Sequence, residues 1–526
     1  MYVRKLKKQV ICDYGQAEVK TREGILRGVI SDGTFVFRGV DYAKAERFGM
    51  PKPVEPWEGV KEAIVYGFCC PEIFTPVPHD QFNVPHYFGV QGEDCQNLNI
   101  WTNSIDENAK KPVMVWLHGG GYFSGSGIEH YAYDGENLAK EGDVVVVTVT
   151  HRLNILGFLD LSAYGEEYKN SGNLGMADLV AALEWVKNNI AAFGGDPENV
   201  MIFGQSGGGG KVATLLQMPA ADGLYKKAVL QSGGMTKGRE ITKEIAKRTA
   251  ELVLEYLKIE PENIGKIKEV CYDELAEAAN FAQQQMEKET GRRMMWGPVC
   301  DGEYYMGHPL EVGFRETAKN IPNLCGTVLG EFMNNFASPK GEGSKNSWTE
   351  AYKKEMLESY FGEKTEDLEK AFIAAYPEKN TADLLFMDIS GRKAALEFAR
   401  AHSKMGGAPT FNYIFTWESQ FNGGTVAWHN AEIPYIFRNA DYLEPSFTPG
   451  ETEALQEIVS SSWVNFAKNG DPNGGVVPEW KAITENENYT MIFDRESKLA
   501  LAHDADLLSL MPEVTVSLAG LMGKKK

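Results

Sequence analysis

Residues 198–216, ENVMIFGQSGGGGKVATLL, lead from an apolar run through four glycines into a helical pattern. Within them, residues 204–208 read GQSGG and match the pattern G-x-S-x-G. Strand, tight turn and helix in this order are typical of a nucleophile elbow, in which a serine sits on a sharply bent backbone. Glycine on either side of the serine removes side chains that would collide at the bend. The stretch therefore requires a strand that leads directly into a helix. It predicts that Ser206 lies at the helix start, where N–H groups favour negative charge.

The same glycines, followed by Lys211, could instead belong to a phosphate-binding loop. A P-loop reads G-x-x-x-x-G-K-[ST], so that backbone N–H groups surround the phosphates and the hydroxyl holds magnesium. Counting back from Lys211, Gln205 stands where the first glycine should be, and Val212 stands where the hydroxyl residue should be. Two fixed positions fail, so this motif does not predict nucleotide binding.

The rest of the pattern predicts an α/β fold. Residues 112–121 (PVMVWLHGGG) and 143–153 (DVVVVTVTHRL) are near-continuous apolar runs, the kind buried on both faces of a parallel sheet. Residues 175–190 follow with apolar side chains on one helical face. Further strand patterns lie at 225–233, 323–331 and 410–419. Strands that alternate with helices indicate a mostly parallel, twisted central sheet flanked by helices.

We expect the chain, residues 1–526, to form a single domain, although its length alone would suggest about three or four. Charged helical patterns at about 236–291 and 347–405 interrupt the strand pattern, and no Ser-, Gly- or Pro-rich linker separates the pieces. These two segments are therefore predicted to be helical insertions into one sheet-based domain.

The composition indicates which binding partners and which cellular compartment to expect. A formal net charge of −20 repels nucleic acid and anionic membrane surfaces. No run approaches the roughly 18 apolar residues of a membrane span, and the first residues lack the apolar segment of a signal peptide. Seven cysteines without a CxxC pair argue against a disulfide framework and a zinc site. We therefore expect a cytoplasmic protein.

A second glycine-rich turn, LHGGGYFSG at residues 117–125, follows one of the buried strands. A serine at its ordinary pKa is a poor nucleophile, and it needs a general base, an orienting acid and donors for the oxyanion. Glycines at a strand end let backbone N–H groups point into a cleft. We expect Gly120 and Gly121, together with Gly207 after the serine, to supply the oxyanion hole.

These motifs resemble the type-B carboxylesterases, a family that includes bacterial p-nitrobenzyl esterases and the cholinesterases. The similarity runs from about residue 24 to residue 494. It includes GEDCQNLNIW (92–101), the whole segment 172–208 and WVNFAKNGDPN (463–473), in the family's order. The resemblance implies an α/β-hydrolase fold and a serine hydrolase that acts on carboxylic esters.

The resemblance also implies partners for Ser206. CGTVLGEFMNNF (325–336) places Glu331 as the acid, and WHNAEIPYIF (428–437) places His429 as the base. The order Ser, Glu, His is that of α/β-hydrolases. Taken alone, a glutamate is ordinarily a surface residue and one histidine among nine is ordinarily structural. Both assignments therefore depend on the resemblance. Substrate-binding candidates are Tyr122, Trp296 and Trp428, although core packing is the ordinary role of such side chains.

The sequence departs from the family's pattern beside the serine. Gln205 stands for the usual Glu, and Gly207 stands for the usual Ala. Alanine at residue 207 would keep the N–H donor, so we expect the glycine to leave space for a bulky acyl or alcohol group. Cys70 and Cys95 match a cysteine pair of the family and, in a reducing cytosol, are expected to be free thiols.

We therefore expect a serine carboxylic ester hydrolase that forms an acyl-enzyme with small to medium-sized, or bulky, esters. It would need no metal or cofactor, would have no nucleic-acid or membrane partner, and would be a monomer or homodimer. An amidase, thioesterase or lactonase would use the same triad, and the sequence does not separate these from an esterase. A catalytically inactive, cholinesterase-like binding protein is the alternative of another class, against which the complete Ser, Glu and His set argues.

Overall fold

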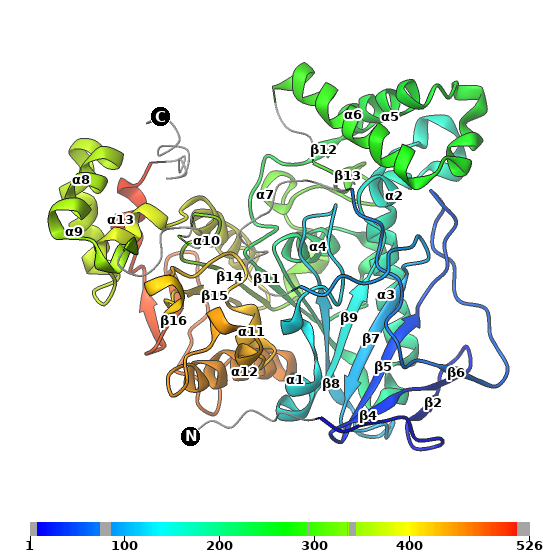
Figure 1. The fold of residues 1–526 in the computed structure, drawn as a ribbon, viewed down its shortest axis with the longest axis horizontal. Helices are drawn as coiled ribbons and strands as arrows, with labels where there is room; N and C mark the ends of the chain where they lie inside the picture. Colours follow the sequence, from blue (N-terminus) through cyan, green and yellow to red (C-terminus); the bar gives the residue numbers. More distant parts are fainter. Residues whose placement is uncertain (1–7, 74–85, 292–294, 334, 336–342, 513–526) are drawn as a thin grey trace.

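A 12-stranded sheet runs through the computed structural model, which describes residues 8–73, 86–291, 295–333, 335 and 343–512 (Figure 1). The central strands pair in parallel, in the order β9 (Val145–Thr150), β8 (Lys111–Leu117), β10 (Gly195–Gln205), β11 (Lys227–Gln231), β14 (Asn323–Val328), β15 (Thr410–Phe415) and β16 (Tyr489–Phe493). Antiparallel strands extend both edges: β1 (Val10–Ile11), β4 (Val29–Ser31), β5 (Thr34–Asp41) and β7 (Asn97–Thr102) at one, and β17 (Lys498–Leu501) at the other. The predicted mostly parallel sheet is confirmed.

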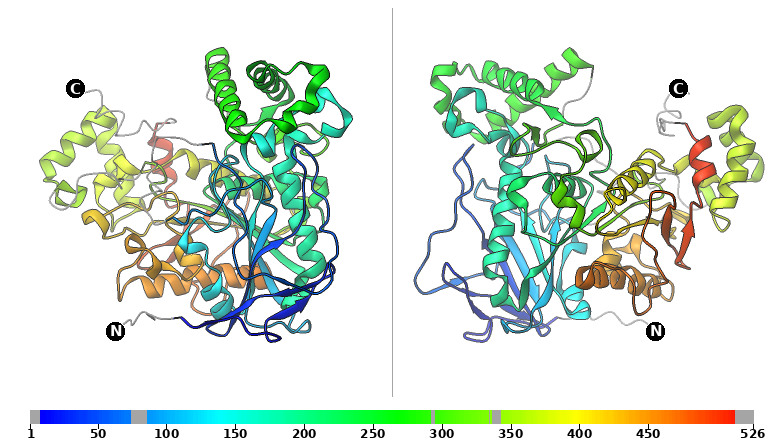
Figure 2. Two further views of the ribbon diagram at one scale, coloured as in Figure 1. Left: turned by 45° about the vertical axis from the view of Figure 1, so that its right-hand side comes forward. Right: turned by 180° about the vertical axis from the view of Figure 1, so that it is seen from behind.

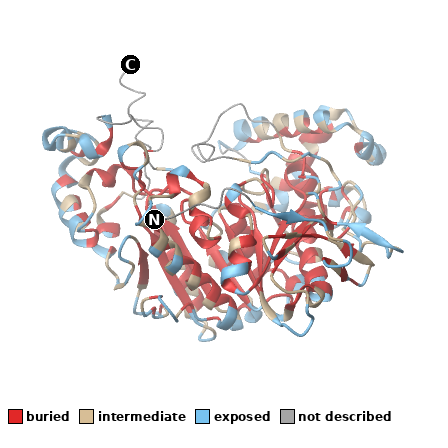
Figure 3. Ribbon diagram, turned by 60° about the horizontal axis from the view of Figure 1, so that its bottom comes forward, coloured by how far each residue is buried: buried red, intermediate tan, exposed pale blue. Residues whose placement is uncertain are grey.

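The apolar runs explain why these strands form the centre. Every residue of β9, β11 and β15 is buried, because helices cover both faces of a parallel sheet. Figure 3 shows this burial in the strands and in the helix faces turned toward them. The helices beside the sheet are α1 (Glu136–Gly142), α3 (Leu174–Asn189), α4 (Gly207–Leu216), α10 (Ser390–Ser403) and α12 (Thr452–Asn469). The helix predicted at 175–190 is therefore confirmed as α3.

Two helix pairs lie away from the sheet, at different ends of the molecule (Figures 1 and 2). They are α5 (Lys243–Leu257) with α6 (Tyr272–Thr290), and α8 (Glu350–Phe361) with α9 (Thr365–Ala375). These pairs occupy the two segments expected as helical insertions. The second segment also contains α10, which does not lie away from the sheet, because its buried face packs against β14 and β15.

Shorter elements complete the described residues. A small sheet joins β2 (Glu18–Lys20), β3 (Ile25–Arg27) and β6 (Val60–Glu62), and a second joins β12 (Ile241–Thr242) and β13 (Val299–Cys300). The short helices are α2 (Asn154–Phe158), α7 (Pro309–Val312), α11 (Ile433–Ile436) and α13 (Ala505–Leu510). Of the helices in the described part of the chain, none has the length and apolar character needed to cross a bilayer.

The parallel strands determine where functional residues can meet. The carboxyl ends of parallel strands share one edge of a sheet, and ligands of open α/β sheets bind there. The glycine turn follows β8, Ser206 follows β10, and Glu331 follows β14 by three residues. His429 lies in the segment that follows β15 and contacts the end of β10 through Gln205. Residues far apart in the sequence are thus brought to one edge.

Candidate active site

Ser206 occupies a strained turn between β10 and α4. Its φ of 57° and ψ of −121° lie in a region that L-residues rarely adopt, and its N–H donates to the carbonyl of Gln231 at 2.8 Å. A Cβ on Gly204 would lie 2.5 Å from the backbone of Gly208. A Cβ on Gly208 would lie 1.9 Å from the Leu117 carbonyl oxygen. Only glycine fits at either position, so the turn has the geometry that the G-x-S-x-G pattern predicts.

Glu331 and His429 form a buried hydrogen-bonded pair. Nδ1 of His429 donates to Oε2 of Glu331, and each residue is only 4% exposed. The other carboxylate oxygen of Glu331 accepts the Val328 N–H at 3.0 Å. Because Nδ1 carries the proton, the neutral imidazole has its lone pair on Nε2. That nitrogen is buried and has no hydrogen-bond partner among the residues that the structure describes.

Burial also determines the protonation of this pair. It lowers the pKa of His429 to about 4, partly offset by the negative charges of Glu432 and Asp388. Burial raises the pKa of Glu331, and the nearby Ser232 hydroxyl and the Val328 N–H work against this rise. The imidazole is therefore neutral at pH 7, as a general base has to be.

Gln205 connects the elbow to the histidine segment. Its side-chain amide donates to the main-chain carbonyl of His429, and the side chain is buried. A carboxylate cannot donate this hydrogen bond, so the glutamine that departs from the family's pattern has a specific partner here. The serine strand and the histidine segment are thus held together one residue before the nucleophile.

The glycine turn after β8 lies directly against the start of α4. Gly120 and Gly121 have φ of +79° and +66°, which glycine adopts without strain. A Cβ on Gly207 would lie 2.1 Å from the Gly121 carbonyl oxygen and 2.4 Å from the Gly121 Cα. The space that we expected Gly207 to leave for a bulky substrate is filled by this backbone, so that interpretation is wrong. Glycine is needed at residue 207 because the turn packs so closely on the helix.

The three pocket candidates pack inside the protein. The Tyr122 hydroxyl lies 3.0 Å from Thr214 Oγ1 on α4, and its ring meets the Phe158 ring edge-on at 5.4 Å. Trp296 and Trp428 are both buried, and the backbone of Trp428 bridges to that of Glu331. None of the three lines the cavity beside the glycine turn.

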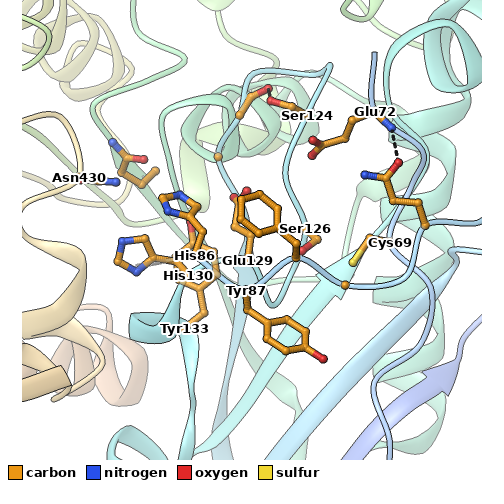
Figure 4. A pocket seen from close by; sticks show the side chains of 16 residues that line it. Cys69, Glu72, His86, Tyr87, Ser124, Ser126, Glu129, His130, Tyr133 and Asn430 are labelled. Carbon is orange, nitrogen blue, oxygen red and sulfur yellow. Dashed lines mark hydrogen bonds between the residues drawn. The ribbon is translucent and has the colours of Figure 1, made fainter. Parts of the chain in front are cut away.

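That cavity has a volume of about 70 Å³ and adjoins Gly119, Gly120 and Gln205 (Figure 4). Polar side chains dominate its wall, among them Glu72, Ser124, Glu129, His130 and Asn430. Burial raises the pKa of Glu72 and raises that of Glu129 to about 8. The cavity beside the candidate oxyanion hole is thus lined by two carboxyl groups that burial shifts toward the neutral form.

Comparison with known proteins decides the family. The sequence profile of the carboxylesterase family matches residues 15–507. The chain belongs to this family. Its fold is the α/β-hydrolase fold, and the protein is a serine carboxylic ester hydrolase.

Several relatives cover almost the whole carboxylesterase chain. The para-nitrobenzyl esterase of Bacillus subtilis (strain 168) is 36% identical over 487 residues, which are 91% of this chain and 95% of the relative. An esterase from the anaerobe Clostridium hathewayi, described as able to hydrolyse aliphatic aromatic polyesters, has a TM-score of 0.90 at 42% identity, covering 96% of this chain and 99% of its own. A carboxylesterase of Geobacillus stearothermophilus has a TM-score of 0.72 at 33% identity, covering 94% and 100%.

Sequence reasoning missed several residues at the site of this carboxylesterase. Glu432 is fully buried near Glu331, and burial raises its pKa to about 8. Its position three residues after His429 was visible, but no pattern separates a buried glutamate from a surface one. Lys211 is also fully buried, although lysine is almost never buried without a partner. Its place directly after four glycines was the signal available for it.

Proposed function

We propose that Ser206, His429 and Glu331 carry out the ester hydrolysis as nucleophile, general base and orienting acid. The observation that carries this proposal is the Glu331–His429 hydrogen bond. With Nδ1 engaged by Glu331, Nε2 of His429 is buried and has no partner among the described residues. It lies at the sheet edge where Ser206 occupies a strained turn. A base oriented by a carboxylate beside a serine is the arrangement that acyl transfer requires.

The chemistry then proceeds in two stages. Nε2 of His429 takes the hydroxyl proton as Ser206 Oγ attacks the ester carbon, and the C=O electron pair moves onto oxygen. We assign the N–H groups of Gly120, Gly121 and Gly207 to this oxyanion. The imidazolium returns its proton to the leaving alcohol, which gives the acyl-enzyme. Water attacks through the same base, and the acid departs as Ser206 regains its proton. None of these steps draws on a metal or cofactor.

The substrate class is also a proposal. The relation to the polyester-hydrolysing C. hathewayi esterase supports activity on aliphatic aromatic polyesters as well as on simple esters. Phe332 supports the same idea, because its ring lies 3.8 Å from the His429 ring and the residue is 59% exposed. An exposed aromatic ring beside the base offers a surface for the aromatic units of a polymer.

We also propose the location, the oligomeric state and the residues that contact the substrate. We keep Tyr122, Trp296 and Trp428 as candidates for substrate binding. All seven cysteines are free thiols, including the buried, hydrogen-bonded pair Cys70 and Cys95, which supports a cytoplasmic location. We propose a monomer or homodimer.

Labelling with a fluorophosphonate probe tests the assignment of the nucleophile. We expect one covalent adduct, located on Ser206 by peptide mass spectrometry, and none on a folded Ser206→Ala variant. An adduct on another serine, or turnover by Ser206→Ala within about tenfold of wild type, contradicts the assignment. A panel of p-nitrophenyl esters, thioesters, anilides, lactones and an aliphatic aromatic polyester film then measures the substrate class. Faster turnover of amides, thioesters or lactones than of esters would favour the alternatives.

A further inference from the structure

Lys211 is a buried lysine directly behind the glycine turn. It lies on α4, five residues after Ser206, and it is 0% exposed. Its Nζ donates to the main-chain carbonyl of His118 at 2.8 Å. Four glycines precede it, so the helix start carries no side chains and approaches β8 closely enough for this contact. Burying an ammonium group is costly unless its interactions compensate the loss of water.

The groups around Lys211 provide few such interactions. The rings of His118 and His151 lie 5.2 Å apart, and each Nδ1 donates to a main-chain carbonyl, at 2.9 and 2.8 Å. Both Nε2 atoms are buried and lack a partner among the described residues. Burial and the nearby Lys211 hold the pKa of both histidines well below the ordinary value, so both rings are neutral.

Glu129, in the cavity wall of Figure 4, is the acidic side chain close enough to Lys211 to interact with its charge. A Cβ on Gly125 would lie 2.8 Å from both Glu129 Oε1 and His118 Nδ1, so this carboxyl group borders the same cluster. Burial lowers the pKa of Lys211 to about 7, and Glu129 and Cys70 act against that fall. In either protonation state Nζ remains a donor to His118.

The contact with His118 matters because the glycine turn begins at the next residue. Gly119, Gly120 and Gly121 have no side chains that could fix their conformation. The Gly120 carbonyl accepts hydrogen bonds from the N–H and hydroxyl of Ser124, both at 3.1 Å, which close the far side of the turn. At the near side, Lys211 joins the end of β8 to the helix that begins at the nucleophile.

We propose that Lys211 is a positioning residue of the oxyanion hole, fixing the turn 119–121 against α4 through the His118 carbonyl. The inference rests on the proposed function of Ser206 and of the glycine N–H groups. It gives Lys211 a role in positioning the oxyanion donors, a role that none of the three triad residues has. Without the lysine, the His118 carbonyl would be left without its donor, and the turn could rotate away from the helix.

Lys211→Met tests the proposal, with Lys227→Met as the matched control. Methionine keeps most of the length but removes the donor. Lys227 is also buried, on β11, where its Nζ bonds Asn199 Oδ1. We expect Lys211→Met to lower kcat by about tenfold or more with KM within about threefold of wild type, because donors aimed at the oxyanion act in the transition state. Affinity for a trifluoromethyl ketone, which forms an oxyanion on the serine, should fall by a similar factor. Lys227→Met should keep the wild-type kcat.

A second variant keeps the test decisive if Lys211→Met does not fold. In Lys211→Leu the side chain likewise has no donor for the His118 carbonyl, so we expect the same selective loss of kcat. A wild-type kcat in either folded variant, or an equal loss in Lys227→Met, overturns the proposal. Fluorophosphonate labelling separates this outcome from failure of the proposed function: wild type that does not label at Ser206 contradicts the triad itself.

Discussion

Two buried glutamates near His429 provide a test at the scale of single residues. Of the two, Glu331 bonds the imidazole, whereas Glu432 accepts long hydrogen bonds of 3.4 Å from Gln231 and Tyr413. Glu331→Gln should lower kcat by roughly 10²- to 10⁴-fold with little change in KM, because it disturbs the tautomer and the support of the imidazolium. Glu432→Gln, the matched control, should lower kcat far less. If steady-state kinetics show the reverse order, Glu432 is the acid and the assignment is wrong.

The pH dependence of activity derives from the burial of His429. Protonation of Nε2 blocks proton abstraction, and burial lowers the pKa of this imidazole from 6.5 to about 4. Activity is therefore lost only as the pH falls through this lowered pKa. We expect kcat/KM to be constant from pH 7 down to about pH 5, to decline below that and to be half lost near the lowered pKa of about 4. Circular dichroism over the same range separates titration from acid unfolding. An inflection at or above pH 6.5 would contradict the expected effect of burial.

Gly207 gives a prediction opposite to the one that the sequence favoured. A Cβ at this position meets the backbone of Gly121, so Gly207→Ala must displace the turn that is assigned to the oxyanion. We expect roughly 10²-fold lower kcat/KM on acetates and on bulky esters alike, since small misplacements of catalytic groups cost about that much. Gly265→Ala, where a Cβ meets nothing within 4 Å, is the control. Loss confined to bulky esters in a size-graded series would restore the steric interpretation.

Features of the site that the backbone shape specifies could be predicted from the sequence, whereas features that depend on side-chain contacts could not. The Ser206 turn was predictable because its glycines and flanking periodicities specify one backbone shape. Glu331 and His429 needed the family resemblance, since one glutamate or histidine resembles any other in composition. The contacts of Gln205 and Lys211 with main-chain carbonyls were not predictable, because they depend on which strand ends become neighbours in three dimensions.

At the scale of elements, apolar continuity predicted the central strands well. β8, β9, β11, β14 and β15 are buried on both faces, and nothing but a covered parallel sheet accommodates such runs. The two small sheets were not predicted, because strands of two or three residues show no periodicity. The longer antiparallel edge strands, such as β5 with eight residues and β7 with six, were not predicted either. The sequence pattern predicted one helical insertion over residues 347–405. In the structure α10 covers the sheet, whereas α8 and α9 lie away from it.

Arg392 anchors α10 to the sheet and is the main stability prediction at this scale. It is 1% exposed and bonds Asp504 Oδ2 at 2.7 Å, Asn412 on β15 at 2.6 Å and Thr490 on β16 at 2.9 Å. Arg392→Met should lower the free energy of unfolding by about 3–5 kcal/mol, because it leaves a buried carboxylate uncompensated. Adding Asp504→Asn should recover part of the loss. Urea unfolding measures both, and a loss below about 1 kcal/mol would contradict the anchoring role.

At the scale of the whole molecule, one sheet connects the two ends of the described chain. β1 and β17 belong to the same 12-stranded sheet, although they come from opposite ends of the sequence. Each strand shares its hydrogen bonds and its helical cover with neighbours drawn from different parts of the chain. This arrangement supports our proposal that the protein is a single domain, and urea unfolding can test it.

Arg392→Met, although it lies in the C-terminal half, should therefore shift the unfolding of the entire sheet. In urea we expect far-UV circular dichroism, tryptophan fluorescence and residual esterase activity to give one coincident midpoint in wild type and one lower coincident midpoint in the variant. The midpoints should coincide because strands β14 to β16 cannot separate from β10 and β11 without exposing faces buried on both sides. If the variant instead shows two transitions, with only one of them shifted, the two halves unfold independently and the single-domain proposal fails.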